Sequence, residues 1–120
     1  MSSKKNINIS SRKIARRRGY MAERKIRGLF EKHGWKTIRA GASLGEADLI
    51  CIKNKKCVLI QVKCTKKKTF YYYDFMEKEI EGFPFFIAVD FGYGKIRLLL
   101  PQKKVLPSDG VPLIDFLKRH

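Results

Sequence analysis

Two apolar, β-rich runs separated by four polar residues are the feature that most constrains the fold of this chain. The runs cover residues 47–52 and 57–63, and the polar link 53–56 contains Asn54. A link of this length, with an asparagine that tolerates positive φ, is typical of a tight β-hairpin. We therefore predict an antiparallel hairpin at the centre of a β-sheet.

The pattern around this hairpin predicts helices and further strands. Apolar residues recur at helical spacing from Tyr20 to His33, and Gly34 follows where a left-handed residue would end the helix. Strands are expected at 35–39, 85–89 and 95–100, a short helical stretch after Tyr73 through Ile80, and a terminal helix at 113–118. The predicted fold class is α/β, with a mixed central β-sheet flanked by helices.

The charge of the chain favours a polyanionic partner. It has 27 Lys and Arg against 11 Asp and Glu, which gives a net charge of +16 over 120 residues. Such an excess repels itself unless a polyanion neutralises it, so we expect a nucleic-acid partner. Residues 1–18 hold seven basic residues and no acid, and we predict a flexible basic arm there, followed by a single domain over 19–120. The arm either contacts phosphates or is a solvated tail.

The sequence also argues against a membrane or exported protein. No apolar run approaches the roughly 20 residues of a membrane span, and no long apolar region follows the arginines at 16–18. Cys51, Cys57 and Cys64 lack the paired spacing of a zinc site, and we interpret them as small buried hydrophobes. We expect a cytoplasmic protein with no membrane partner and no small-molecule substrate.

Polar residues interrupt the apolar strands at one end of the predicted hairpin. Asp48 lies near the start of the first strand, where a carboxylate is costly unless it binds a metal, a cation or several donors. Gln61 and Lys63 are two residues apart and therefore point to one face of the second strand. Because the strands are antiparallel, all three meet at one end of the sheet. Glu23 borders the apolar stripe of the helix and is placed to lean over that end.

The order and spacing of these residues resemble the PD-(D/E)XK nuclease superfamily, and within it the archaeal Holliday junction resolvases. The resemblance covers nearly all of residues 18–120. The matching segments are Arg18-Gly19, Ala22-Glu23-Arg24, Glu31-Lys32-His33-Gly34, Arg39 to Ser43, Asp48-Leu49-Ile50, Ile60-Gln61-Val62-Lys63, Thr65-Lys66-Lys67 and Gly110-Val111-Pro112-Leu113. The resemblance implies a restriction endonuclease-like core and an endonuclease that resolves four-way DNA junctions.

The resemblance also implies the roles of individual residues. Glu23, Asp48 and Gln61 would be ligands of Mg²⁺, for which Mn²⁺ could substitute. Lys63 would be the cation near the attacking water or the scissile phosphate, and Ser43 a hydroxyl facing the phosphate. A homodimer is implied as well, because a junction offers two related strands to two related sites. The basic residues expected to contact DNA are Arg16, Arg17, Arg18, Arg24, Arg39, Lys66, Lys67 and Lys68.

Gln61 departs from the family pattern, which has a carboxylate at this position. An amide offers one carbonyl oxygen and no charge, so it binds a hard cation less well. Three interpretations stay open: a working neutral ligand, an engineered substitution that inactivates the chain, and a natural loss of activity. Glu46 could supply a compensating carboxylate if the loop bends.

Other functions also fit parts of the sequence. A non-catalytic branched-DNA-binding protein would keep the fold and lose the metal site at Gln61. A basic RNA-binding or ribosome-associated protein is favoured by charge alone, and a flap or a mismatch is a different nuclease substrate. The segment 66–73, three lysines followed by aromatic residues, predicts a DNA-facing edge or a surface for a protein partner, and stacking of splayed bases is a third, rarer use.

Overall fold

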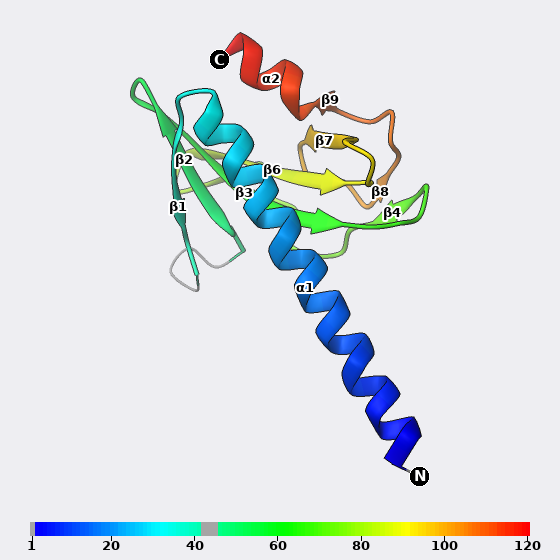
Figure 1. Cartoon of the computed structure of the whole chain (residues 1–120). Helices are drawn as coiled ribbons and strands as arrows, with labels where there is room; N and C mark the ends of the chain where they lie inside the picture. Colours follow the sequence, from blue (N-terminus) through cyan, green and yellow to red (C-terminus); the bar gives the residue numbers. More distant parts are fainter. Residues whose placement is uncertain (1, 42–45) are drawn as a thin grey trace.

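The computed structural model describes residues 2–41 and 46–120, and for residues 2–13 and 15 the description is limited to the backbone. Its main element is a seven-stranded mixed sheet (Figure 1). The strand order is β1 (Lys36–Arg39), β2 (Leu49–Lys53), β3 (Lys56–Cys64), β6 (Phe83–Asp90), β7 (Ile96–Leu99) and β9 (Val111–Pro112), and β5 (Glu79–Ile80) pairs with β6 outside this order. Neighbouring strands are antiparallel except for the parallel pair β3 and β6. The predicted mixed sheet is confirmed.

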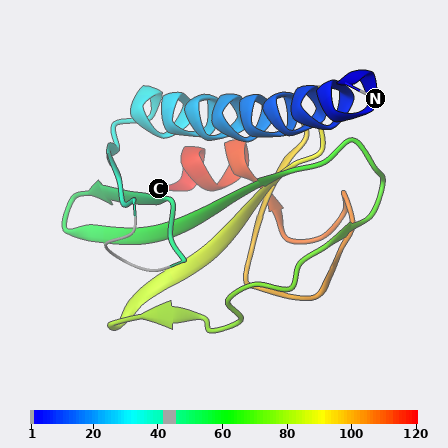
Figure 2. The same ribbon diagram turned by 90° about the horizontal axis from the view of Figure 1, so that it is seen from below.

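Two helices lie on the same face of the sheet, α1 (Ser2–Lys32) and α2 (Leu113–Arg119) (Figure 2). Ile26 and Phe30 of α1 and Leu113 and Leu117 of α2 are buried against this face in one apolar cluster. The terminal helix agrees with the prediction. Burial of these side chains, rather than helix propensity, is what holds short α2 in place.

The opposite face of the sheet is covered without a helix in the described residues. A second apolar cluster there contains Leu59, Ile87 and Tyr72. Its cover comes from a two-stranded sheet, β4 (Phe70–Tyr71) with β8 (Lys104–Val105), and from the segment between β4 and β5. The two faces of β3 therefore contact different surroundings, which decides where its polar residues lie.

The central hairpin forms as its sequence predicts. Residues 49–53 pair with 56–60 in antiparallel register, and Asn54 and Lys55 have φ values of 49° and 67°. Two successive residues with positive φ make the turn whose twist matches that of the strands. The helix cap at Gly34 is also confirmed. Gly34 has φ of 87°, and the N–H of the next residue, Trp35, donates to the Phe30 carbonyl at 3.0 Å.

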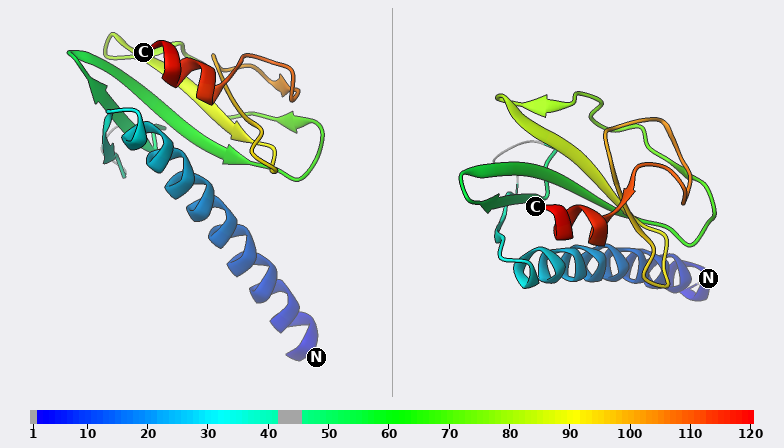
Figure 3. Two further views of the ribbon diagram at one scale, coloured as in Figure 1. Left: turned by 45° about the horizontal axis from the view of Figure 1, so that its top comes forward. Right: turned by 90° about the horizontal axis from the view of Figure 1, so that it is seen from above.

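The start of α1 differs from the prediction. We expected a helix from Tyr20, but α1 begins at Ser2, so residues 2–18 form its first half. This segment contains no glycine or proline and is rich in basic residues of good helix propensity, so nothing in it ends the helix. Figure 3 shows this half projecting away from the sheet. Despite its length, neither α1 nor any other helix of the described residues is apolar enough to cross a membrane.

The predicted helical stretch after Tyr73 is wrong. Residues 70–80, all described, contain the short strands β4 and β5 instead. Glu81 and Gly82 have φ values of 53° and 84° and form the turn that pairs Ile80 with Phe83. Gly82 is therefore a hairpin residue and not a helix stop, and the aromatic residues before it favour extended backbone.

Candidate active site

Asp48 is fixed between two strands just before β2. Its backbone N–H donates to the Ile60 carbonyl at 2.8 Å, and its carbonyl accepts from Ala40 at 3.0 Å. Its side-chain Oδ2 accepts from the Val62 N–H at 2.7 Å. No other described residue donates a hydrogen bond to this carboxylate, so its second oxygen remains available for a ligand.

Glu23 reaches the same place from α1. Arg39, at the end of β1, donates from Nε to Glu23 Oε1 at 2.7 Å. Glu23, Arg39, Gly41 and Asp48 line a cavity of 320 Å³. The predicted meeting of Glu23 and Asp48 therefore occurs in the structure. Arg39, which we expected on DNA, forms an ion pair with one of the two predicted carboxylate ligands.

The surroundings of Asp48 disfavour its charge overall. Burial raises the pKa of the Asp48 carboxyl, and the nearby Glu23 carboxylate raises it further. The hydrogen bond from Val62 and the charges of Lys63 and Arg39 lower the pKa, but they do not cancel the effect of burial. A cation bound between the two carboxylates would relieve both unfavourable effects.

Gln61 points to the face of the sheet opposite the two helices, where Leu59 and Tyr72 also lie, and it is buried, with 7% of its surface exposed. Its Oε1 is 2.5 Å from the Tyr72 hydroxyl, which is also 2.8 Å from the Phe75 carbonyl. A tyrosine hydroxyl has one proton, so it cannot donate to both oxygens at once. If the proton goes to Phe75, the Gln61 amide must turn its NH₂ toward Tyr72. In that orientation the Gln61 carbonyl oxygen is free for another ligand.

Lys63 also has a partner that the sequence did not suggest. Its Nζ is 2.7 Å from Asp74 Oδ2. Tyr72 and Asp74 are two residues apart, as are Gln61 and Lys63, so an extended segment places each beside its partner on β3. The same spacing was the available signal in the sequence, but predicting a helix after Tyr73 concealed it.

The candidate ligands are of the type that a hard cation prefers, but they are few. Among the described residues there is no group of three or more His, Cys, Asp or Glu side chains placed to hold a metal ion. Glu23 and Asp48 supply two carboxylates, and Gln61 can add a carbonyl oxygen, all of which are oxygen ligands of the kind magnesium takes. Arg39 competes for Glu23.

The remaining predicted site residues are the basic residues expected on DNA and Ser43. Arg16, Arg17, Arg18 and Arg24 are exposed on α1, and Lys66, Lys67 and Lys68 are exposed in the loop after β3. Their positions permit contact with DNA. Ser43 lies outside the described residues.

Comparison with known proteins identifies the family of this chain. A model of the archaeal Holliday junction resolvase family (Hjc) matches residues 14–115. The chain belongs to this family. The fold is similar to that of Archaeoglobus fulgidus Hjc, a Holliday junction resolvase from an archaeal hyperthermophile, with a TM-score of 0.65 and 19% sequence identity over 84% of this chain and 96% of that chain. The α/β restriction endonuclease-like core is confirmed, and family membership gives the function class as a structure-specific junction endonuclease.

Proposed function

We propose that this chain cuts four-way DNA junctions by magnesium-dependent hydrolysis of a phosphodiester. The supporting observation is the position of Asp48, which the Val62 N–H fixes close to both Glu23 and Lys63. We assign Glu23, Asp48 and Gln61 as the residues that would hold Mg²⁺ or its substitute Mn²⁺. The enzyme would act on DNA inside the cell, with residues 1–18 as a basic arm on the phosphates.

The residues of the chain have distinct tasks in this proposal. When bound, magnesium supplies polarisation of a phosphoryl oxygen and a water of lowered pKa. Lys63 offsets the negative charge that develops on the phosphate. Asp74 holds Lys63 at 2.7 Å, so an incoming phosphate must displace or share this ion pair. Asp74 thereby positions the lysine before DNA arrives.

Gln61 is the proposed ligand that departs from the family's carboxylate. We propose that it is a working neutral ligand, because the Tyr72 and Phe75 contacts permit an orientation with its carbonyl oxygen free. A second candidate function is binding of branched DNA without cleavage. It is favoured by the Arg39 ion pair, which occupies Glu23 where a metal would need it.

A cleavage assay tests the proposed function. We expect the chain to cut a labelled four-way junction in the presence of Mg²⁺, to stop when the metal is chelated, and to leave a duplex of equal length intact. Binding should be tighter for the junction than for the duplex at about 0.15 M salt, and each phosphate contact should add roughly 0.9 to the salt slope. Equal affinity for the two DNAs would exclude junction recognition.

We also propose that the chain works as a homodimer. Tyr71, Tyr73 and Phe83 are 53%, 73% and 48% exposed, which is a large apolar area for so small a protein. Light scattering at micromolar concentration should therefore give twice the 14.0 kDa mass of one chain. A mass of one chain throughout this range would contradict the dimer.

A further inference from the structure

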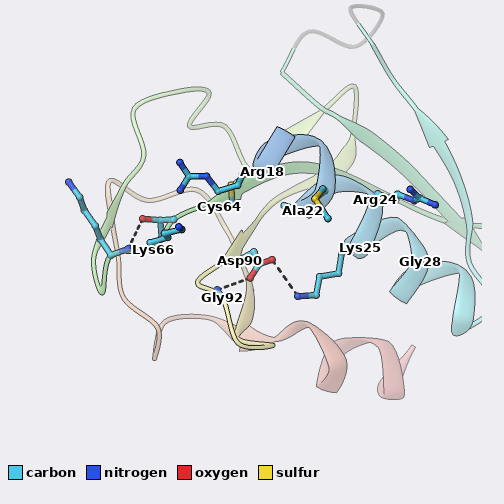
Figure 4. A pocket seen from close by; sticks show the side chains of 12 residues that line it. Arg18, Ala22, Arg24, Lys25, Gly28, Cys64, Lys66, Asp90 and Gly92 are labelled. Atoms are coloured by element: carbon cyan, nitrogen blue, oxygen red, sulfur yellow. Dashed lines mark hydrogen bonds and ion pairs between the residues drawn. The ribbon is translucent and has the colours of Figure 1, made fainter. Parts of the chain in front are cut away.

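A large groove lies on the flank of α1 that faces away from Glu23. Its volume is 980 Å³, and it is bounded by α1, by the ends of β3 and β6, and by the loops that follow them (Figure 4). At 3.6 residues per turn, Arg18 and Lys25 point to the opposite side of α1 from Glu23. The helix therefore separates this groove from the cavity that contains Glu23 and Asp48.

The groove concentrates positive charge. Five basic residues line it, with one carboxylate: Arg18, Arg24, Lys25, Lys66, Lys67 and Asp90. Asp90 is already engaged, because its Oδ1 accepts from the Gly92 N–H at 2.8 Å and its Oδ2 is 3.8 Å from Lys25 Nζ. The other four basic residues form no ion pair within the described part of the chain. The charge of the groove therefore fits a polyanion.

Part of the groove lining is apolar. Met21 and Ala22 of α1 and Cys64 of β3 contribute to it. Basic groups together with an apolar lining suit a nucleic-acid backbone, in which sugars alternate with phosphates. They suit a small inorganic anion less well, because such an anion has no apolar part.

The groove and the candidate active site lie on opposite sides of the end of β3. Successive residues of a strand point to opposite faces, so Lys63 faces the candidate active site while Cys64 faces the groove. With its side chains, α1 is about 10 Å wide and stands between the two sites. One straight duplex cannot follow both flanks of this helix, whereas two arms of a branched DNA can.

We propose that the groove binds the phosphate backbone of a second arm of the junction while the arm to be cut lies at Glu23 and Asp48. This inference rests on the proposed function, since it assumes that a branched DNA is the substrate. Preference for a junction over a duplex then results from filling both flanks of α1 at once.

The test compares charge changes in the groove with matched changes elsewhere. Lys25→Gln combined with Lys66→Gln removes two groove cations, and Lys36→Gln combined with Lys118→Gln removes two exposed cations on β1 and α2. We expect the groove variant to lower the ratio of junction affinity to duplex affinity at least fivefold. It should also reduce the junction salt slope by about 2, from roughly 0.9 for each lost phosphate contact. The control variant should leave the ratio unchanged.

Asp90→Asn makes the groove more positive, whereas the double Lys→Gln variant makes it less positive. Asp90→Asn removes the only carboxylate among the described residues that line the groove but keeps an oxygen that can accept from Gly92. We expect this variant to raise the affinity ratio. Partial unfolding would not mimic that result, because a damaged groove would lower the ratio instead.

The outcomes separate this proposal from the proposed function. If the parent chain prefers junctions and the groove variant keeps the same ratio, the groove proposal is wrong and the proposed function stands. A groove variant that changes the mass in solution would show a protein interface there and overturn the proposal. If the parent chain shows no preference for junctions, both proposals fail.

Discussion

We expect Asp48→Asn to abolish cleavage of a four-way junction and to leave junction binding nearly intact. The substitution removes one of the two charged oxygen ligands for a hard cation, and it removes no predicted phosphate contact. An asparagine oxygen still accepts the Val62 N–H, which now donates to Asp48 at 2.7 Å, so the local fold is kept. Cleavage under single-turnover conditions and binding without metal are the two measurements.

The stability of the same variant provides an independent control. The folded protein raises the pKa of Asp48 above its ordinary value of 3.8, chiefly by burial. The ionised carboxylate therefore destabilises the fold. Stability is lost as the pH rises from 3.8, the ordinary pKa, through the raised pKa of the folded protein. At neutral pH the metal-free Asn variant should unfold at a higher temperature than the parent. If the Asp48→Asn variant still cleaves the junction, Asp48 is not a catalytic residue.

The second large effect is expected at Gln61. Gln61→Glu should raise the rate of junction cleavage about tenfold or more, because it supplies a charged oxygen ligand in place of a neutral one. A tenfold gain corresponds to roughly 1.4 kcal/mol of activation free energy. The Tyr72 hydroxyl, which is 2.5 Å from Gln61 Oε1, can donate to the new carboxylate.

Metal binding measured by calorimetry should change in the same direction. We expect Gln61→Glu to bind Mn²⁺ more tightly than the parent, and Gln61→Ala to bind it more weakly. If the parent already cuts efficiently and the Glu variant cuts no faster, glutamine is fully adequate as a ligand. If neither chain cuts with Mg²⁺ or Mn²⁺, the protein binds branched DNA without cutting it.

Local patterns predicted the parts of the fold that depend on neighbouring residues. Asn54 at the hairpin turn and Gly34 at the end of α1 adopt the positive φ that their positions suggested. The start of α1 was predicted wrongly because apolar periodicity reports only the half that packs on the sheet. Residues 2–18 contain few apolar residues, and their lack of helix breakers is a weaker signal.

Strand geometry predicted only part of the candidate site. Pairing of β2 with β3 brings Asp48 beside residues 60–62, and this follows from the hairpin alone. The Glu23 to Arg39 ion pair depends on how α1 lies against β1. The contacts of Tyr72 and Asp74 depend on the path of a segment without regular structure. Their spacing matches that of Gln61 and Lys63, but the helix predicted after Tyr73 concealed this signal.

The parallel pairing of β3 with β6 has a consequence for how such a site can change. Parallel neighbours cannot be joined by a tight turn, so the chain must return along the length of the sheet between Cys64 and Phe83. It returns across the face that carries Gln61 and Lys63, and it contributes Tyr72 and Asp74 to them. The connection that the topology requires is thus also one wall of the candidate active site. Insertions or deletions in this connection before β5 would reshape access to Lys63 without disturbing any strand of the central sheet.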